Sequence, residues 1–222
     1  MSEFLKKQSE WQQQATSSDD FKAQVGRPQS DASWQQLALD VKHKLNLIDG
    51  DSLLDVGCGS GLLLSKLANH CASVAGIDYA QAMVDKAQQL IPNGTFYCGE
   101  AAALKFDSNS FDKLLSYSIF HYFPSQDYAI DVIKEMARVV KPGGVILIGD
   151  VLDADFEMAI KSGSNLEYEQ KIPYIHRYSQ WRFYDLAHLQ DAVSHLVNKF
   201  EVLTQPSEFE LSGYRKDIRL WL

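Results

Sequence analysis

Short apolar runs alternate with amphipathic segments of helical length from residue 52 onward. The first five runs are SLLDV, SVAGID, TFYC, FDKLLSYS and GGVILIGD, and helical patterns over residues 60–70, 80–90 and 126–140 separate most of them. Strands that alternate with helices of this length are typical of right-handed βαβ crossovers. The pattern therefore predicts an α/β domain built on a doubly wound, mostly parallel sheet with helices on both faces.

The residues before this core have a different hydrophobic pattern. Residues 1–30 are polar, and the isolated Trp11 and Phe21 are candidates to anchor a short helix onto another part of the chain. A helical pattern with apolar positions at three- and four-residue spacing follows over residues 31–45. We expect residues 1–44 to form an N-terminal helical arm or lid.

The region after the core also departs from the alternation. Residues 151–184 contain an aromatic stretch of mixed charge, EYEQKIPYIHRYSQWRFY, which we interpret as a substrate-side insertion. A helical pattern over 185–196 follows, and then two β-like runs, KFEVLTQ and KDIRLWL. Because only a short polar segment joins these runs, they predict an antiparallel hairpin at one sheet edge. Residues 45–222 are thus expected to form the main domain.

Composition narrows the classes of function. The 222 residues are 45% hydrophobic, enough for one sizeable core, and the formal net charge of −8 disfavours double-stranded nucleic acid as a partner. The three cysteines, Cys58, Cys71 and Cys98, form no disulfide or zinc pattern, so a reducing compartment fits best. No stretch has the length of a membrane span. We expect a soluble, cytoplasmic protein that does not bind membranes.

The glycine-rich segment DVGCGSG, residues 55–61, lies between an apolar run and an amphipathic helical pattern. Glycines here allow a sharp turn after the strand and let backbone N–H groups approach a ligand that a Cβ atom would repel. The start of the next helix offers unpaired N–H groups to an anionic group. Cys58 is interpreted as the small residue that this turn requires rather than as a reactive thiol.

An acidic residue, Asp78, ends the next apolar run, SVAGID. In open α/β sheets this position lies beside the glycine loop, and a carboxylate there accepts hydrogen bonds from ribose hydroxyls. The loop and Asp78 together predict a site for a nucleoside-containing cofactor.

These motifs resemble those of the class I S-adenosylmethionine-dependent methyltransferases over residues 45–150. LLDVGCGSG is similar to the first motif of that family, VAGIDYAQAMVDKA to the second and CGEAAALKFDSNSFD to the third, and LLSYSIFHYF and RVVKPGGVILIGD resemble later segments. The resemblance implies S-adenosylmethionine as cofactor and a Rossmann-like sheet of seven strands with one antiparallel strand near the edge.

The resemblance also implies roles for individual residues. Met83 would lie against the adenine, and Glu100 stands where the family usually has an Asp that binds the adenine amino group. Ser116 and Tyr117 belong to the segment that lines the methionine end. The residues expected to bind the cofactor are Asp55, Gly57, Cys58, Gly59, Gly61, Asp78, Tyr79, Met83, Glu100, Ala101, Ser116 and Tyr117.

Candidates outside these motifs are less sharply defined. His121 could act as a general base or could be a structural histidine that caps the next turn. Tyr174, His176 and Tyr178 could line a substrate pocket or form the core of the insertion, and Arg27 is a candidate to pair with the methionine carboxylate. The three acids Asp150, Asp153 and Asp155 lack accompanying amide or histidine ligands, so we predict no metal site.

The motifs favour methyl transfer to a small molecule by in-line displacement, with the acceptor atom (O, N or C) left open. A nicotinamide-dependent oxidoreductase is an alternative, but its fingerprint requires a glycine where this chain has Leu62. The other alternative is a methyltransferase-like subunit that binds without turnover. The sequence leaves the oligomeric state open.

Overall fold

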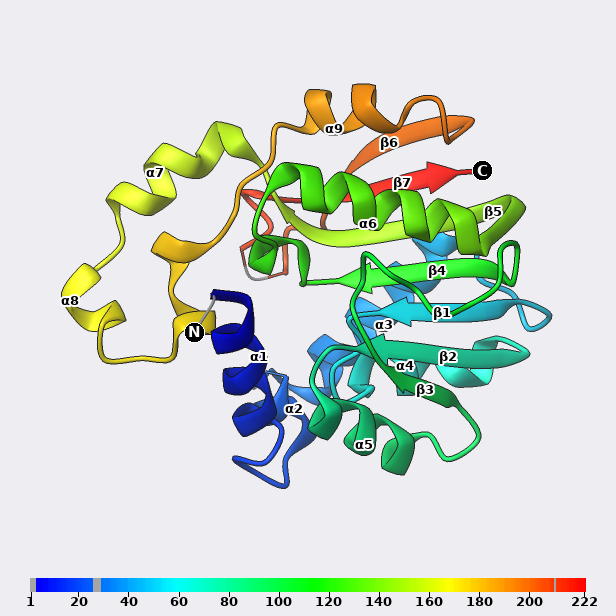
Figure 1. Cartoon of the computed structure of the whole chain (residues 1–222), viewed down its shortest axis with the longest axis horizontal. Coiled ribbons are helices and arrows are strands. Elements are labelled where there is room, and N and C mark those ends of the chain that lie inside the picture. Colours follow the sequence, from blue (N-terminus) through cyan, green and yellow to red (C-terminus); the bar gives the residue numbers. More distant parts are fainter. Residues whose placement is uncertain (1–2, 26–28, 210) are drawn as a thin grey trace.

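The computed structural model describes residues 3–25, 29–209 and 211–222. Within these residues, seven strands form one sheet in the order β3-β2-β1-β4-β5-β7-β6 (Figure 1). The strands are β1 (Ser52–Val56), β2 (Ser73–Asp78), β3 (Thr95–Cys98), β4 (Phe111–Tyr117), β5 (Val140–Leu152), β6 (Lys199–Thr204) and β7 (Arg215–Trp221). The α/β class and the mostly parallel sheet predicted from the alternation are confirmed.

The hairpin of β6 and β7 differs from the predicted edge hairpin in its place in the strand order. β6 and β7 pair antiparallel as predicted, but β7 also pairs antiparallel with β5, so the reversed strand lies inside the sheet and makes two antiparallel pairings. Burial explains this order, because Ile218 and Leu220 of β7 are fully buried whereas β6 exposes Val202. The more apolar strand takes the position between two neighbours.

Helices cover both faces of the sheet, and each face has its own apolar cluster. α6 (Gln126–Val139) and α9 (Leu186–Val193) pack together on one face, where Ile133 and Leu189 are fully buried. α3 (Asp31–Leu45) and α4 (Leu62–Leu67) pack together in the cluster of the opposite face. α5 (Gln81–Leu90) lies beside β2 and β3. Of the predicted arm, α3 is therefore part of the core.

The remaining helices gather at the carboxyl ends of the parallel strands. α1 (Glu3–Gln14) and α2 (Phe21–Gln24) lie at this edge, and α7 (Glu157–Ser162) and α8 (Leu166–Glu169) extend farther out (Figure 1). α1 contacts the short 3-10 helix η4 (Tyr174–His176) and also α5. Residues 3–14 and residues 174–176, far apart in the sequence, thus meet at the edge where open α/β sheets bind ligands.

β5 is longer than expected at both ends. It begins at Val140, before the apolar run GGVILIGD, and it continues to Leu152, two residues into the region predicted as an insertion. Nowhere in the described chain is there a helix both long and apolar enough to cross a membrane.

Candidate functional site

The glycine loop between β1 and α4 forms a backbone cradle. Gly57, Gly59 and Gly61 have φ values of +81°, +53° and +78°, a region that side-chain-bearing residues rarely adopt. A Cβ on Gly57 would come within 2.5 Å of Ile119, and one on Gly61 within 3.1 Å of Ala87. Both conformation and space therefore require glycine, which explains the motif at these positions.

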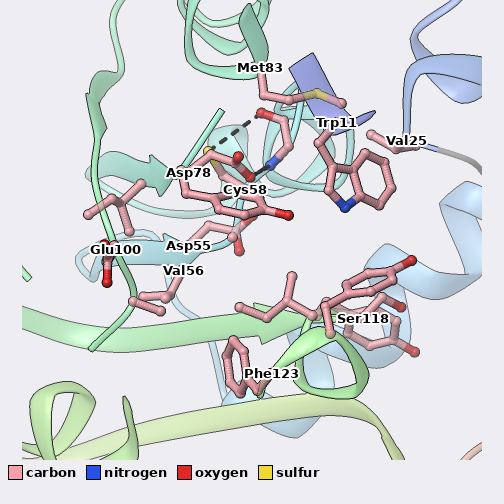
Figure 2. A pocket seen from close by; sticks show the side chains of 18 of the residues that line it. Trp11, Val25, Asp55, Val56, Cys58, Asp78, Met83, Glu100, Ser118 and Phe123 are labelled. Atoms are coloured by element: carbon pink, nitrogen blue, oxygen red, sulfur yellow. Dashed lines mark hydrogen bonds between the residues drawn. The ribbon is translucent and has the colours of Figure 1, made fainter. Parts of the chain in front are cut away.

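The parallel register of β1 and β2 brings two buried acids beside this cradle. The Asp78 carboxylate accepts hydrogen bonds from the backbone N–H of Gly59 at 3.0 Å and of Ala80 at 2.9 Å, and it lies close to Asp55 and Cys58 (Figure 2). Asp55 is 3% exposed and Asp78 is 8% exposed. The Asp78 carboxylate, at the end of β2, therefore holds the neighbouring glycine loop in place.

Burial sets the protonation of the three ionisable groups on this wall. Burial raises the pKa of Asp78 to about 6, although backbone hydrogen bonds partly oppose the shift. Burial, with the nearby Asp78 charge, raises the pKa of Asp55 to about 8. Burial also raises the pKa of the Cys58 thiol well above its ordinary value, which disfavours the thiolate form that a nucleophile requires.

A single cavity opens above the cradle and joins most of the predicted residues. It measures about 1180 Å³ when the space at its mouth is included, which is large enough for a nucleoside-sized cofactor beside a second small molecule. Predicted residues that line it are Asp55, Gly57, Cys58, Gly59, Asp78, Tyr79, Met83, Glu100, Ala101 and Tyr117. Gly61 and Ser116 lie just outside the lining, and the buried Ser116 hydroxyl donates to the Val56 carbonyl at 2.9 Å.

The side of the cavity opposite the cradle comes from residues that sequence reasoning did not assign to the site. Trp11 points into the cavity, and Phe123 and Ser118 lie across from it (Figure 2). The further unassigned lining residues are Lys7, Val25, Trp34, Val56, Leu62, Leu63, Ile77, Gly99, Ile119, Tyr122, Pro124 and Tyr128. The isolated tryptophan in a polar segment was the one signal for this wall.

Hydrogen bonds hold α1 over the cavity at three places. The Gln8 side chain donates to the Tyr79 carbonyl at 2.7 Å, and the Gln12 side-chain oxygen accepts from the Ala82 N–H at 3.0 Å. Lys7 donates to the Tyr122 carbonyl at 2.8 Å, and the rings of Trp11 and Tyr122 meet edge to face with centroids 5.6 Å apart. α1 therefore bridges the segments that follow β2 and β4.

The predicted catalytic and substrate residues lie outside the cavity lining. His121 is buried, with its ring stacked at a tilt between Tyr122 and Trp181. His176 lies behind Trp11, with ring centroids 6.4 Å apart, and burial lowers its pKa. Their assigned roles stay predictions.

The roles assigned to Tyr174, Tyr178 and Arg27 also stay predictions. Tyr174 donates to the Gln180 side chain at 2.9 Å, and Tyr178 packs edge to face on Trp181. Neither lines the cavity. Arg27, the candidate partner of the methionine carboxylate, lies outside the described residues.

A buried ionic network supports the floor of the cavity at the ends of β4 and β5. Ser118 and Asp150 both have φ values of +62°, and the Ser118 hydroxyl hydrogen-bonds to the Asp150 carboxylate. Arg215 pairs with Asp150 at 2.5 Å, and Gln205 donates to Asp150 at 2.8 Å. Asp150 is thus committed to a buried pair, and no metal-binding group of three His, Cys, Asp or Glu occurs in the described residues.

Comparisons with known proteins agree with this geometry. Residues 54–148 match the family model described as a methyltransferase domain. The chain is 26% identical over 201 residues to an uncharacterized methyltransferase of Schizosaccharomyces pombe, which covers 84% of this chain and 73% of that protein. It is 31% identical over 121 residues to a ubiquinone biosynthesis O-methyltransferase of Coxiella burnetii, which covers 53% of this chain and 47% of that protein.

A solved structure shows the same fold. Magnesium protoporphyrin IX methyltransferase from Synechocystis, crystallised with bound S-adenosylmethionine, matches with a TM-score of 0.58 and 18% sequence identity, over 84% of this chain and 78% of that one. The chain spans about half the length of the Coxiella relative that it matches.

Proposed function

Residues 54–148 of this chain are a methyltransferase domain of the class I, S-adenosylmethionine-dependent family, and from this premise we propose that the enzyme methylates a small molecule held beneath α1. The observation that carries the proposal is the cavity itself. One wall has the geometry of a nucleoside cradle, and the facing wall is built from aromatic side chains of α1 and the segment after β4. A cofactor and an acceptor can therefore lie side by side.

The residues of the cradle fit S-adenosylmethionine. At Gly57, which lines the cavity, the space that a Cβ would fill is taken by Ile119, so bare backbone borders the ligand there. Asp78 supplies a carboxylate for the ribose hydroxyls, and Met83 and Glu100 line the end expected to hold the adenine. The cofactor supplies a methyl group already activated by its sulfonium sulfur.

The chain's own contribution to the reaction is then mainly positioning. Fixing an acceptor in line with the transferred methyl group removes translational and rotational freedom that would otherwise raise the barrier, an effect worth ~7 kcal/mol or more. Trp11, Tyr122 and Phe123 form apolar walls that would exclude water and hold a flat or apolar acceptor. The choice of acceptor atom depends on which group such a molecule presents to the methyl.

Three features support a small acceptor over a macromolecule. α1 is held to Tyr79 by Gln8 and to Tyr122 by Lys7, and its Lys7 and Trp11 line the cavity, an arrangement that favours a compact acceptor. The net charge of −8 disfavours a phosphate backbone. The Coxiella relative is named for ubiquinone biosynthesis and the Synechocystis neighbour for magnesium protoporphyrin IX, and both names denote small-molecule acceptors.

A screen of small-molecule acceptors with a methyl-labelled donor tests the proposal. We expect labelled methyl to appear in a low-molecular-weight product, with S-adenosylhomocysteine formed in equal amount. Label that enters only protein or nucleic acid would contradict the small-molecule assignment. A thermal shift run beside the screen should show stabilisation by S-adenosylhomocysteine, ~2.7 kcal/mol at 100 times its Kd, and none by NAD.

A further inference from the structure

Three buried polar side-chain atoms, in residues that line the cavity or adjoin lining residues, have no hydrogen-bond partner within the part of the chain that the structure describes. They are the indole nitrogen of Trp34, the hydroxyl of Ser60 and the side-chain oxygen of Gln24. Trp34 is 4% exposed, and Ser60 and Gln24 are fully buried. Buried polar groups in folded proteins nearly always have partners, so such a group at a cavity wall indicates a ligand.

Contacts between α2 and the glycine loop bring these atoms to one junction. A Cβ on Gly59, which precedes Ser60, would lie 3.3 Å from Cγ1 of Val25, which follows Gln24. Val25 also packs against the apolar cluster that contains Trp34. Val25, Gly59 and Trp34 all line the cavity, so the junction forms its wall on the α3 side.

Trp34 is the residue of the three whose own side chain lines the cavity. Its neighbours in the cluster, such as Leu37 and Leu63, have apolar side chains, and no described residue accepts from the indole nitrogen. A ligand in the cavity can supply that acceptor. An indole nitrogen only donates, so the matching group must be an acceptor.

We propose that the indole N–H of Trp34 donates a hydrogen bond to the carboxylate of the cofactor's methionine part, a role that rests on the proposed function. The adenosine end is expected at Asp78, at the end of β2, and at Met83 in α5, whereas Trp34 comes from α3, which packs against β4 and β5. The methionine end carries an ammonium group, which only donates, and a carboxylate, which only accepts. The carboxylate is the group that a lone donor selects, and its charge strengthens the bond.

The test compares two ligands in wild-type protein and in Trp34→Phe, which keeps an aromatic ring and removes the N–H. S-adenosylhomocysteine has the amino-acid end, and 5′-methylthioadenosine keeps the adenosine and the sulfur but lacks that end. By calorimetry, we expect Trp34→Phe to weaken S-adenosylhomocysteine about tenfold, as for loss of a hydrogen bond to a charged group, and to change 5′-methylthioadenosine less than twofold.

Trp221→Phe is the matched control, because the Trp221 indole donates to Glu201 at 2.8 Å and Trp221 is not among the residues that line the cavity. Neither affinity should change in this variant. Equal affinity of Trp34→Phe and wild type for S-adenosylhomocysteine overturns the Trp34 assignment alone, whereas failure of wild type to bind either ligand overturns the proposed function.

A measurement on wild-type protein covers the case in which Trp34→Phe does not fold. The indole proton resonance of Trp34, assigned by elimination with the phenylalanine variants of the other three tryptophans, should move downfield with S-adenosylhomocysteine and stay in place with 5′-methylthioadenosine. The same shift with both ligands, or with neither, contradicts the proposed contact.

Discussion

The two walls of the cavity are built in different ways. The cradle wall takes its shape from backbone in a short stretch, residues 55–61, and from one acid on the neighbouring strand. The wall formed by α1 depends on side chains that meet across long separations, such as Gln8 with Tyr79 and Glu10 with the N–H of Ile175. The cofactor half of the site is thus local, whereas the acceptor half is assembled from distant segments.

The walls also differ in what holds them in place. β1 and α4 lie in a core whose members, such as Leu53 and Leu64, are fully buried. α1 instead rests on a few hydrogen bonds, on the ring contacts of Trp11 with Tyr122 and His176 and on a small apolar cluster, and it exposes Leu5 to solvent. Regions with few buried apolar contacts open at lower free energy. We therefore expect α1 to open and close over a rigid cradle.

The largest effect should come from removing the acid of the cradle. Asp78→Ala takes away both hydrogen-bond acceptors for the ribose, so we expect affinity for S-adenosylhomocysteine to fall at least ~100-fold by calorimetry, as for lost hydrogen bonds to a charged group. The fold should survive, because the fully buried apolar residues beside the cradle, such as Leu53 and Leu64, hold β1 and α4 in place without Asp78.

Asp85→Ala is the control for this variant, because it removes a carboxylate from α5, the helix that follows Asp78. Asp85 is exposed and accepts from the Gln81 side chain at 2.7 Å. Its removal should leave the affinity unchanged. An Asp78→Ala protein that binds as tightly as wild type would show that the cradle does not hold the ribose through this carboxylate.

The pH dependence of cofactor binding should report the same carboxylate. With a pKa of about 6, Asp78 is mostly ionised at pH 7 and mostly protonated at pH 5, while Asp55, with a pKa of about 8, keeps its proton over this range. If only the ionised Asp78 accepts the ribose hydroxyls, affinity should drop about tenfold from pH 7 to pH 5. Asp78→Asn should give a flat profile, and a drop that persists in that variant would point to another group.

Much of the cradle half could be predicted from the sequence, because its determinants are local. Glycines required by positive φ, an acid at a strand end and the alternation of strands and helices all leave short-range signatures, so ten of the predicted residues line the cavity. The insertion of β7 between β5 and β6 left no such signature, since pairing order depends on which strand buries more apolar surface.

The acceptor half could not be predicted in this way. His121, Tyr174 and His176 had suitable chemistry, but packing placed His121 against Trp181 and placed His176 behind Trp11. The side chains that do line the cavity, such as Lys7 and Ser118, come from segments far apart in the sequence. Residue spacing along the chain does not show that these segments meet. Tertiary contacts decided which of several polar and aromatic residues reached the cavity.

Removing the Trp11 ring, which α1 places over the cavity, should have an intermediate effect on cofactor affinity. Trp11→Ala removes a ring that lines the cavity and packs on Tyr122, so we expect S-adenosylhomocysteine to bind about fivefold more weakly, in line with ~0.5–1.5 kcal/mol for an aromatic contact. Unlike the Asp78 variants, Trp11→Ala should keep the wild-type pH profile, because the carboxylate is untouched. Calorimetry at pH 5 and pH 7 checks both statements, and a loss as large as that of Asp78→Ala would contradict the division of the site into a rigid cradle and a mobile cover.

The smallest effect should come from a cap that α1 supplies to another helix. α5 begins after Ala80, which has no side chain able to accept from the first turn, and the Gln12 oxygen accepts from the Ala82 N–H instead. Gln12→Ala should lower the free energy of unfolding by about 0.5–1 kcal/mol, as for loss of a helix cap, measured by urea denaturation. Gln13→Ala, at an exposed position one residue further on, should have no effect. If the two variants are equally stable, α1 does not hold its place through the start of α5, and the cover depends on its other contacts, such as those of Lys7, Gln8 and Trp11.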